Sequence, residues 1–352
     1  MSAAAPCLLS RRQAVAGLAA LGVAALRPLA AAALPPLMTV YAVWKQAFVR
    51  PDGRVIDPGQ HDASTSEAQG YGMILALAAG DQAGFDAMWA WAQQHLAVRD
   101  DALLAWRWIP GQGVTDKNDA ADSDLLVAWA LARASRQRPA LAAPARAMAQ
   151  AIRGKLLRDT PWGTVLLPAV EGFDTPKGQV VNLSYWVFPA LPELARVDPS
   201  PQWDALRSSG LKLLSIARFG RWGLPPDWLL LVNPLVPDPT RPQRYGYEAV
   251  RIPLYLAWAG LASEELLAPF RAFWESFRCE GYLPAWTNFA DDSIDSFGAS
   301  PGMRAIRDWI ETRRAPPVVG ATLVQSGYYS ATLALLVQAA ARQAPPPYGA
   351  GS

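Results

Sequence analysis

Apolar residues recur every three to four positions along almost the whole chain, and this spacing is the feature that most narrows its possible folds. Leu125, Trp129 and Ala132, for example, lie on one face of a helix that has 3.6 residues per turn. No segment alternates apolar and polar residues for long, and no extended linker rich in proline, glycine or serine interrupts the pattern. The sequence therefore predicts an all-α fold, and the short connections favour one toroid or bundle over two separate domains.

The spacing predicts about eleven helices. Ser66, Asp81 and Ser263 lie where three of them begin, and these residue types cap helix N-termini well. Extended pieces such as residues 163–170 are short. The predicted helices cover residues 38–49, 66–79, 81–95, 122–135, 139–157, 183–196, 201–219, 247–261, 263–277, 300–313 and 325–343.

The N-terminal residues 1–33 have the composition of an export signal. Arg11 and Arg12 precede an uncharged stretch of mostly Ala, Leu, Val and Gly, and an alanine run follows. The paired arginines indicate the twin-arginine route. The alternative is an uncleaved membrane anchor, but the apolar stretch is shorter than the ~20 residues that span a bilayer. We expect a signal peptide at 1–33, one folded domain at 34–343 and a flexible tail at 344–352. The mature protein should be periplasmic or secreted, with no membrane insertion.

The composition excludes several classes of function. A formal net charge of +2 gives no basic character, so we expect no binding to nucleic acid. With two His and two Cys, the chain cannot form a His-rich or Cys-rich metal site, and we expect neither a metal nor another cofactor. The unusual count is 15 Trp, against 10 Tyr and 10 Phe. Sugar rings stack on flat aromatic faces, so either carbohydrate binding or a core of large residues would explain it.

Three acidic segments lie at predicted helix starts, beside aromatic residues. Glu67 lies in the first turn of one helix, close to two glycines, and Asp122 and Asp124 lie at the start of another. Glu248 and Arg251 are three positions apart, so they can pair on one helix face. Taken singly, each segment could be a helix cap, solvated charge or a surface ion pair.

Taken together, the three segments predict two or more carboxylates around one cleft. Glycoside hydrolysis needs such a pair, because one acid protonates the leaving oxygen while the other activates water or attacks the anomeric carbon. Other catalytic patterns fit poorly, since the chain has no Gly-x-Ser-x-Gly motif and too few histidines for a convincing Ser-His-Asp set. The acid-rich segment 116–124 is also a poor calcium loop, because its sixth position is not glycine.

The same segments resemble glycoside hydrolase family 8, and within it the endo-β-1,4-glucanases that accompany bacterial cellulose synthases. The resemblance spans about residues 44–329, and its most specific parts are the blocks 65–72 and 121–124, taken together. The matching pieces follow the family order at 44–45, 53–57, 65–72, 105–108, 121–124, 184–185, 226–228 and 247–251.

The resemblance implies an (α/α)6 barrel of about twelve helices in two layers, with the N-termini of the inner helices facing an open cleft. It implies hydrolysis of β-1,4 bonds with inversion at the anomeric carbon. Glu67 matches the general acid, and Asp122, together with Asp124, matches the acidic pair that contacts the sugar at the cleavage point. Glu248 falls where the cellulase members carry an aspartate that acts as general base. Residues 34–343 are then the catalytic domain.

The chain departs from the family pattern at two positions. Ala121 stands where the signature prefers Ser or Thr, which is a mild change. Glu248 is one methylene longer than the aspartate of the family. Inverting enzymes keep their carboxyls ~6.5–9.5 Å apart to leave room for a water, so a longer base either crowds that water or requires a displaced backbone.

Aromatic residues near these motifs are candidate sugar platforms, and core packing is the alternative for each. Arg251 is a further candidate for the binding site, since pairing with Glu248 would keep that base ionised. The candidates for substrate binding are Trp44, Tyr71, Trp106, Trp108, Tyr185, Trp228, Tyr247 and Arg251.

The resemblance therefore predicts an inverting endo-β-1,4-glucanase that hydrolyses cellulose or a related β-1,4-glucan. It further implies a role in bacterial cellulose synthesis or export, in association with a cellulose synthase complex. Three alternatives remain open from the sequence: a chitosanase, a xylanase, or a non-catalytic glucan-binding protein of an export system.

Overall fold

The computed structural model describes residues 37–344. The predicted signal peptide at 1–33 and residues 345–352 of the predicted tail lie outside the described residues. Within residues 37–344 the chain forms twelve α-helices, joined by short strands, 3-10 turns and loops. The helices are α1 (Leu37–Phe48), α2 (Ser66–Ala79), α3 (Gln82–His95), α4 (Ala121–Ala134), α5 (Ala142–Leu156), α6 (Leu191–Val197), α7 (Gln202–Ile216), α8 (Ile252–Trp258), α9 (Glu264–Ser276), α10 (Pro301–Thr312), α11 (Gly320–Gln325) and α12 (Tyr328–Gln343).

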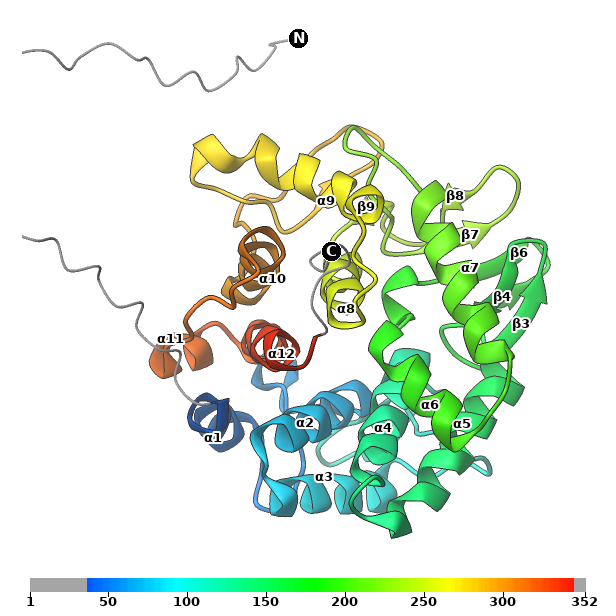
Figure 1. Cartoon of the computed structure of the whole chain (residues 1–352), viewed down its shortest axis with the longest axis vertical. Helices are drawn as coiled ribbons and strands as arrows, with labels where there is room; N and C mark the ends of the chain where they lie inside the picture. Colours follow the sequence, from blue (N-terminus) through cyan, green and yellow to red (C-terminus); the bar gives the residue numbers. More distant parts are fainter. Residues whose placement is uncertain (1–36, 345–352) are drawn as a thin grey trace, which may run out of the picture.

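The even-numbered helices form a closed inner ring (Figure 1). Around this ring α2 packs against α4, α4 against α6, α8 against α10, α10 against α12 and α12 against α2. The remaining gap is closed by η4 (Phe188–Ala190), the 3-10 turn before α6, which packs against α8. The odd-numbered helices lie outside, with α1 against α2 and α12, α5 against α4 and α6, and α7 against α6. Two concentric layers of this kind make an (α/α)6 barrel, which confirms the predicted fold.

Burial explains why the helices divide into two layers. Every residue of α4 except Arg133 is buried, and all residues of α8 are buried, so these helices can only lie inside the molecule. Glycine allows close approach inside the ring: a Cβ on Gly70 of α2 would lie 2.7 Å from the Cβ of Leu126 in α4. In contrast, α9 buries one face and exposes Glu264 and Glu275 on the other, as an outer helix should.

Short antiparallel strands lie in the loops between the helices. The largest group is a four-stranded sheet in which Val180 pairs with Leu230. The pair β1–β2 places Thr65 opposite Arg107, and so brings the segment that contains Glu67 beside the tryptophans of residues 106–108. The strands are β1 (Ser64–Thr65), β2 (Arg107–Trp108), β3 (Leu157–Thr160), β4 (Gly163–Leu166), β5 (Asp174–Thr175), β6 (Gly178–Val181), β7 (Leu229–Leu231), β8 (Val236–Pro237), β9 (Arg244–Tyr245) and β10 (Thr287–Asn288).

Two of the predicted helices are wrong in extent. Residues 183–196 form two 3-10 turns and only then α6, because Asn182 caps Ser184 and prolines sit at the starts of η4 and α6. Residues 247–261 form η5 (Ala249–Arg251) followed by α8, which has Pro253 in its first turn. The six-residue helix α11 was not predicted, since it is too short to show periodicity.

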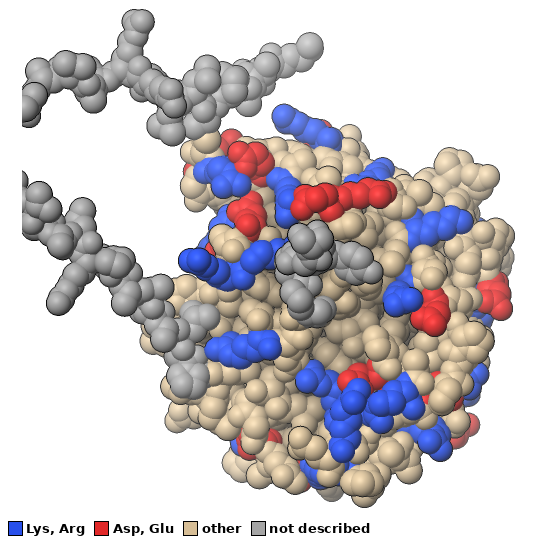
Figure 2. Space-filling view, in the orientation of Figure 1, with Lys and Arg blue, Asp and Glu red and all other residues tan. Residues whose placement is uncertain are grey.

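Charge is mixed over the face of the molecule that Figure 2 shows, where basic and acidic side chains lie between wide uncharged areas. This pattern agrees with the small formal net charge of +2. Among the described residues, no helix has both the length and the apolar character needed to cross a membrane.

Candidate active site

Three inner-ring helices contribute charged side chains to one cluster. Glu67 lies in the first turn of α2, and Asp122 lies in the first turn of α4. Glu248 is the N-cap residue of η5, and Arg251 is the residue from which α8 begins. The starts of these helices therefore meet at one end of the barrel, where helix dipoles favour negative side chains.

Arg251 lies at the centre of this cluster and contacts all three carboxylates. Its Nη1 donates to Oε1 of Glu67 and lies 3.1 Å from Oδ2 of Asp122. Its Nη2 donates to Oε2 of Glu248, and to Oγ of Ser184 at 3.0 Å. One buried guanidinium thus holds together acids that come from three different helix starts, and it faces Glu67 with one nitrogen and Glu248 with the other.

The three acids differ in how far they reach solvent. The side chain of Asp122 is 3% exposed, whereas the side chains of Glu67 and Glu248 are 27% and 30% exposed. Asp122 and Arg251 therefore form the floor of the cluster. Glu67 and Glu248 form its accessible edge, where a ligand can touch them.

Two buried tyrosines support Glu67. The Tyr71 hydroxyl donates to Oε1 of Glu67 at 3.1 Å and lies 3.0 Å from both Nη1 of Arg251 and the hydroxyl of Tyr255. Burial raises the pKa of Tyr71 well above its ordinary value, so the phenol stays neutral and acts as a donor. This network fixes the side chain of Glu67 from the side opposite the solvent.

Three carboxylates around one arginine leave an excess of negative charge. Burial, with the nearby charge of Glu67, raises the pKa of Asp122 to about 8, although Arg251 opposes the shift. Burial also raises the pKa of Glu248, again against the effect of Arg251. Burial and the neighbouring acids thus favour the protonated form of Asp122, whereas Arg251 favours its ionised form.

Replacing Asp122 by asparagine should stabilise the fold at high pH. The pKa of Asp122 is raised above its unfolded value, so the folded state binds a proton that the unfolded state loses between about pH 4 and pH 8. The stability of the natural protein should fall across that window and then level off. Asparagine removes this penalty, so the gain in stability should be larger at pH 8.5 than at pH 4.5. Thermal unfolding at pH 4.5 and 8.5 measures the difference, and a gain that is equal at the two pH values would contradict the expectation.

Asp124 lies away from the cluster, although the family resemblance pairs it with Asp122. Its Oδ1 accepts a hydrogen bond from the backbone N–H of Leu104 at 3.0 Å, and the side chain is fully buried. Burial and the neighbouring Asp119 raise the pKa of Asp124 well above its usual range. Asp124 therefore fastens the segment before Trp106 to the start of α4.

Two of the predicted sugar platforms need correction. Trp44 is 0% exposed, and its Nε1 donates to Oγ1 of Thr332 at 3.0 Å, so it is a core residue between α1 and α12. Tyr71 is also fully buried, so it contributes its hydroxyl to the cluster and offers no ring face to a sugar. In both cases an aromatic at helical spacing near a motif marks the core of the barrel.

The other five aromatic candidates are partly exposed. The guanidinium carbon of Arg251 lies 5.6 Å from the ring centroid of Tyr185. The Tyr185 ring meets Trp228 edge-on, with the two ring centroids 5.9 Å apart. Trp228 in turn stacks on Phe173, with ring centroids 5.7 Å apart, so an aromatic surface runs from the cluster to the four-stranded sheet. The partly exposed candidates are Trp106, Trp108, Tyr185, Trp228 and Tyr247.

Sequence reasoning missed three residues of this site. Tyr255 contacts Tyr71, while Ser184 contacts Arg251 and Asn182 contacts Glu248. The signal for the last two was the polar pair Asn182 and Ser184 before Tyr185. Asn182 directly precedes the predicted helix 183–196, and Ser184 lies inside it.

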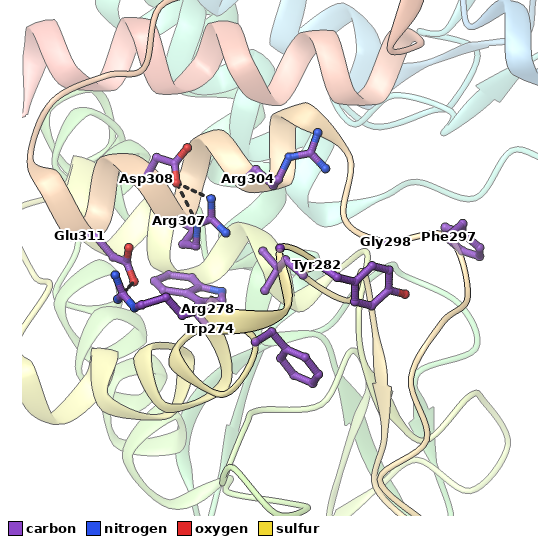
Figure 3. A pocket seen from close by; sticks show the side chains of 12 residues that line it. Trp274, Arg278, Tyr282, Phe297, Gly298, Arg304, Arg307, Asp308 and Glu311 are labelled. Carbon is purple, nitrogen blue, oxygen red and sulfur yellow. Dashed lines mark hydrogen bonds and ion pairs between the residues drawn. The ribbon is translucent and has the colours of Figure 1, made fainter. Parts of the chain in front are cut away.

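A separate cavity of about 490 Å³ lies between the end of α9 and α10, and none of the predicted site residues lines it (Figure 3). Four of its charged side chains form pairs, Arg307 with Asp308 and Arg278 with Glu311, and Arg304 donates to the backbone carbonyl of Ala299. In residues 37–344, no group of three or more His, Cys, Asp or Glu is arranged to hold a metal ion.

Known proteins match almost the whole chain. The model of the family described as glycosyl hydrolases family 8 matches residues 12–343. A probable endoglucanase of Novacetimonas hansenii is 37% identical over 305 residues, which cover 84% of this chain and 88% of the relative. An endoglucanase of Cellulomonas uda is 35% identical over 283 residues, which cover 77% of this chain and 76% of the relative.

The fold also matches solved structures along most of the chain. The endo-β-1,4-glucanase CMCax from Acetobacter xylinum superposes with a TM-score of 0.82 at 35% identity, over 88% of this chain and 98% of that chain. The endoglucanase Cel10 from Klebsiella pneumoniae, described as a family 8 glycosyl hydrolase, superposes with a TM-score of 0.81 at 33% identity, over 87% and 99% of the two chains. With its helical ring, its cluster of acids and these matches in sequence and structure, the chain belongs to glycosyl hydrolase family 8.

Proposed function

We propose that this protein is an inverting endo-β-1,4-glucanase that hydrolyses cellulose or a related β-1,4-glucan. The observation that carries the proposal is the pair of partly exposed carboxylates, Glu67 and Glu248, on opposite nitrogens of one buried arginine. Inverting hydrolysis needs two carboxyl groups with different protonation, held apart and both within reach of the sugar. The names of the relatives, endoglucanases in each case reported above, support the same substrate class.

In this mechanism Glu67 is the general acid. It gives its proton to the glycosidic oxygen as the bond between that oxygen and the anomeric carbon breaks. Glu248 is the general base, and it takes a proton from the water whose oxygen forms the new bond to the anomeric carbon. Arg251 favours the ionised form of Glu248, which is the form that a base requires. Attack from the face opposite the leaving group makes the first product an α-anomer.

The remaining site residues bind the sugar. Asp122, on the floor of the cluster, hydrogen-bonds a hydroxyl of the sugar at the cleavage point. Five aromatic side chains, each partly exposed, supply stacking faces for the glucan. These platforms are Trp106, Trp108, Tyr185, Trp228 and Tyr247.

We place this activity in the periplasm or outside the cell, with a role in bacterial cellulose synthesis or export. The composition of residues 1–33 supports export, with its paired arginines and apolar stretch. The resemblance to glucanases that accompany cellulose synthases supports a functional association with a synthase complex. Fractionation of the producing cells, with detection of the processed chain, tests the compartment.

Assays on three polymers test the substrate. We expect the protein to release reducing ends from carboxymethylcellulose faster than from chitosan or xylan, with an early steep fall in viscosity because cleavage is internal. A higher rate on chitosan or xylan would favour that substrate instead. A folded protein that binds glucan but releases no reducing ends from any of the three would be a non-catalytic binding protein.

Asp122 and Asp124 should differ in what they contribute. Asp122→Ala should remove nearly all activity of the folded protein, because it removes a contact to the sugar and a partner of Arg251. Asp124→Ala should lower the free energy of unfolding by about 1–3 kcal/mol, since it leaves the N–H of Leu104 without its acceptor. The folded fraction of Asp124→Ala should retain measurable turnover. Rates and urea midpoints for both variants check this, and equal, complete inactivation of two well-folded variants would contradict it.

A further inference from the structure

We propose that Asn182 is a positioning residue for Glu248: its amide fixes the carboxylate so that a single oxygen is left to activate water. The proposal rests on the proposed role of Glu248 as general base. Asn182 lies on the loop before the 3-10 turn η3 (Leu183–Tyr185), far from Glu248 in sequence, and it is 0% exposed. No part of its side chain reaches solvent, so its role must lie in its hydrogen bonds.

The orientation of the Asn182 amide is fixed by its neighbour Ser184. Oδ1 of Asn182 accepts from the backbone N–H of Ser184 at 3.0 Å and from its Oγ at 2.7 Å. With two donors on Oδ1, the other end of the amide must be the NH2 group, which can only donate. That group points at Glu248, with Nδ2 3.2 Å from Oε2.

These contacts form a closed circuit of hydrogen bonds in which both arms run from Arg251 to Glu248. Arg251 donates to Ser184, Ser184 donates to Asn182, and Asn182 donates to Glu248, which also accepts from Arg251. Each hydroxyl and amide uses its donor for the next member of the circuit. Such a network holds its members in one arrangement more firmly than isolated pairs would.

The circuit distinguishes the two oxygens of Glu248. Among the described residues, the hydrogen bonds of this carboxylate all go to Oε2, one from Arg251 and one from Asn182. Oε1 is left for the water. The backbone of Glu248 is held as well, because its N–H and that of Ala249 both donate to Oδ1 of the buried Asp227, at 3.2 and 2.9 Å.

A glutamate needs this support more than an aspartate does. Its side chain has one more rotatable bond, so fixing its carboxylate costs more conformational entropy. A base that is displaced by about 1 Å can lose about a hundredfold in rate. The donor from Asn182 holds the end of the longer side chain where the water must be activated.

Kinetics of Asn182 variants across pH test the proposal. Asn182→Ala removes a donor to the ionised carboxylate, so the acidic limb of kcat/KM should move up by about one pH unit. Its kcat should fall by about 10- to 100-fold, with KM changed less than threefold. Asn182→Asp keeps the shape but puts a negative charge beside Glu248, so the shift should be larger. Arg251, Glu67 and Asp227, the other charges that act on Glu248, are unchanged in both variants.

Two further variants separate positioning from a general loss of structure. Ser184→Ala removes one of the two donors to Oδ1 of Asn182 and keeps the backbone donor, so it should shift the acidic limb in the same direction but less. Gln338→Ala is a matched control, because it removes a buried amide that donates to the carbonyl of Pro316. It should lower the melting temperature and leave the pH profile as in the natural protein.

The outcomes are distinct. An Asn182→Asp or Asn182→Ala variant that folds and keeps the natural kcat and acidic limb overturns the proposal. A natural protein without glycosidase activity, or a Glu248→Gln variant with full activity, overturns the proposed function itself.

Discussion

Replacing Glu67 by glutamine should remove most glucan hydrolysis while glucan binding persists. Glutamine has the same shape and still accepts the hydrogen bonds from Tyr71 and Arg251, but it has no acidic proton for the glycosidic oxygen. We expect kcat on an unactivated glucan to fall by about 10²–10⁴-fold, which is the usual contribution of a general acid. Affinity for a cello-oligosaccharide, measured by calorimetry, should change little.

The leaving group offers a second test of the same role. A substrate whose leaving group needs no protonation should lose much less rate with Glu67→Gln than cellulose does. Glu193→Gln is the matched control, because Glu193 on α6 pairs only with the arginines Arg136 and Arg196. A Glu67→Gln variant that keeps a tenth or more of the natural rate on unactivated glucan would rule Glu67 out as the acid.

The second large effect concerns Glu248. Glu248→Ala should be nearly inactive, with kcat lower by about 10²–10⁴-fold, since it removes the group that takes the proton of the water. Glu248→Asp should stay active and could exceed the natural rate, because the family uses aspartate at this position. Reducing-end assays on folded protein give both values.

The stereochemistry of the first product checks the same assignment independently. If Glu248 activates water, NMR of a fresh digest should show the α-anomer before mutarotation. A β-anomer as first product would mean retention, and with it a nucleophile instead of a base. Full activity in Glu248→Ala would leave Glu248 as an ion-pair partner of Arg251 and move water activation to Asp122, the remaining acid of the cluster.

The layered helical fold was predictable because apolar spacing reports burial directly. The all-round apolar character of α4 and α8 is visible in the sequence, and so is the cap at Ser263. The cap of α2 is Thr65, one residue before the predicted Ser66, and its side chain accepts from the backbone N–H of Ala68. The segment 183–196 was not predictable from spacing, because its apolar residues continue the pattern while Asn182 and two prolines impose 3-10 turns. Local side-chain capping and missing N–H groups outweigh periodicity there.

The site was predictable in its acids and less so in its surroundings. Glu67, Asp122 and Glu248 stand at helix starts, so the closure of the ring brings them together, and Arg251 follows from its spacing to Glu248. Asn182 and Tyr255 reach the cluster only through contacts distant in sequence, which no local pattern encodes. Trp44 was wrongly predicted as a sugar platform, because a tryptophan beside a motif looks the same in the sequence whether it lines a cleft or fills a core.

The closed ring also sets the order of events during synthesis. α2, which carries Glu67, is made early, yet one of its ring neighbours is α12, the last described helix. The apolar side of α2 must therefore wait, without its final partner, until almost the whole chain has left the ribosome. A chain that stops before α12 leaves an open ring whose inner surfaces are exposed, and such surfaces aggregate. The native inner ring can thus close only once α12 has been made.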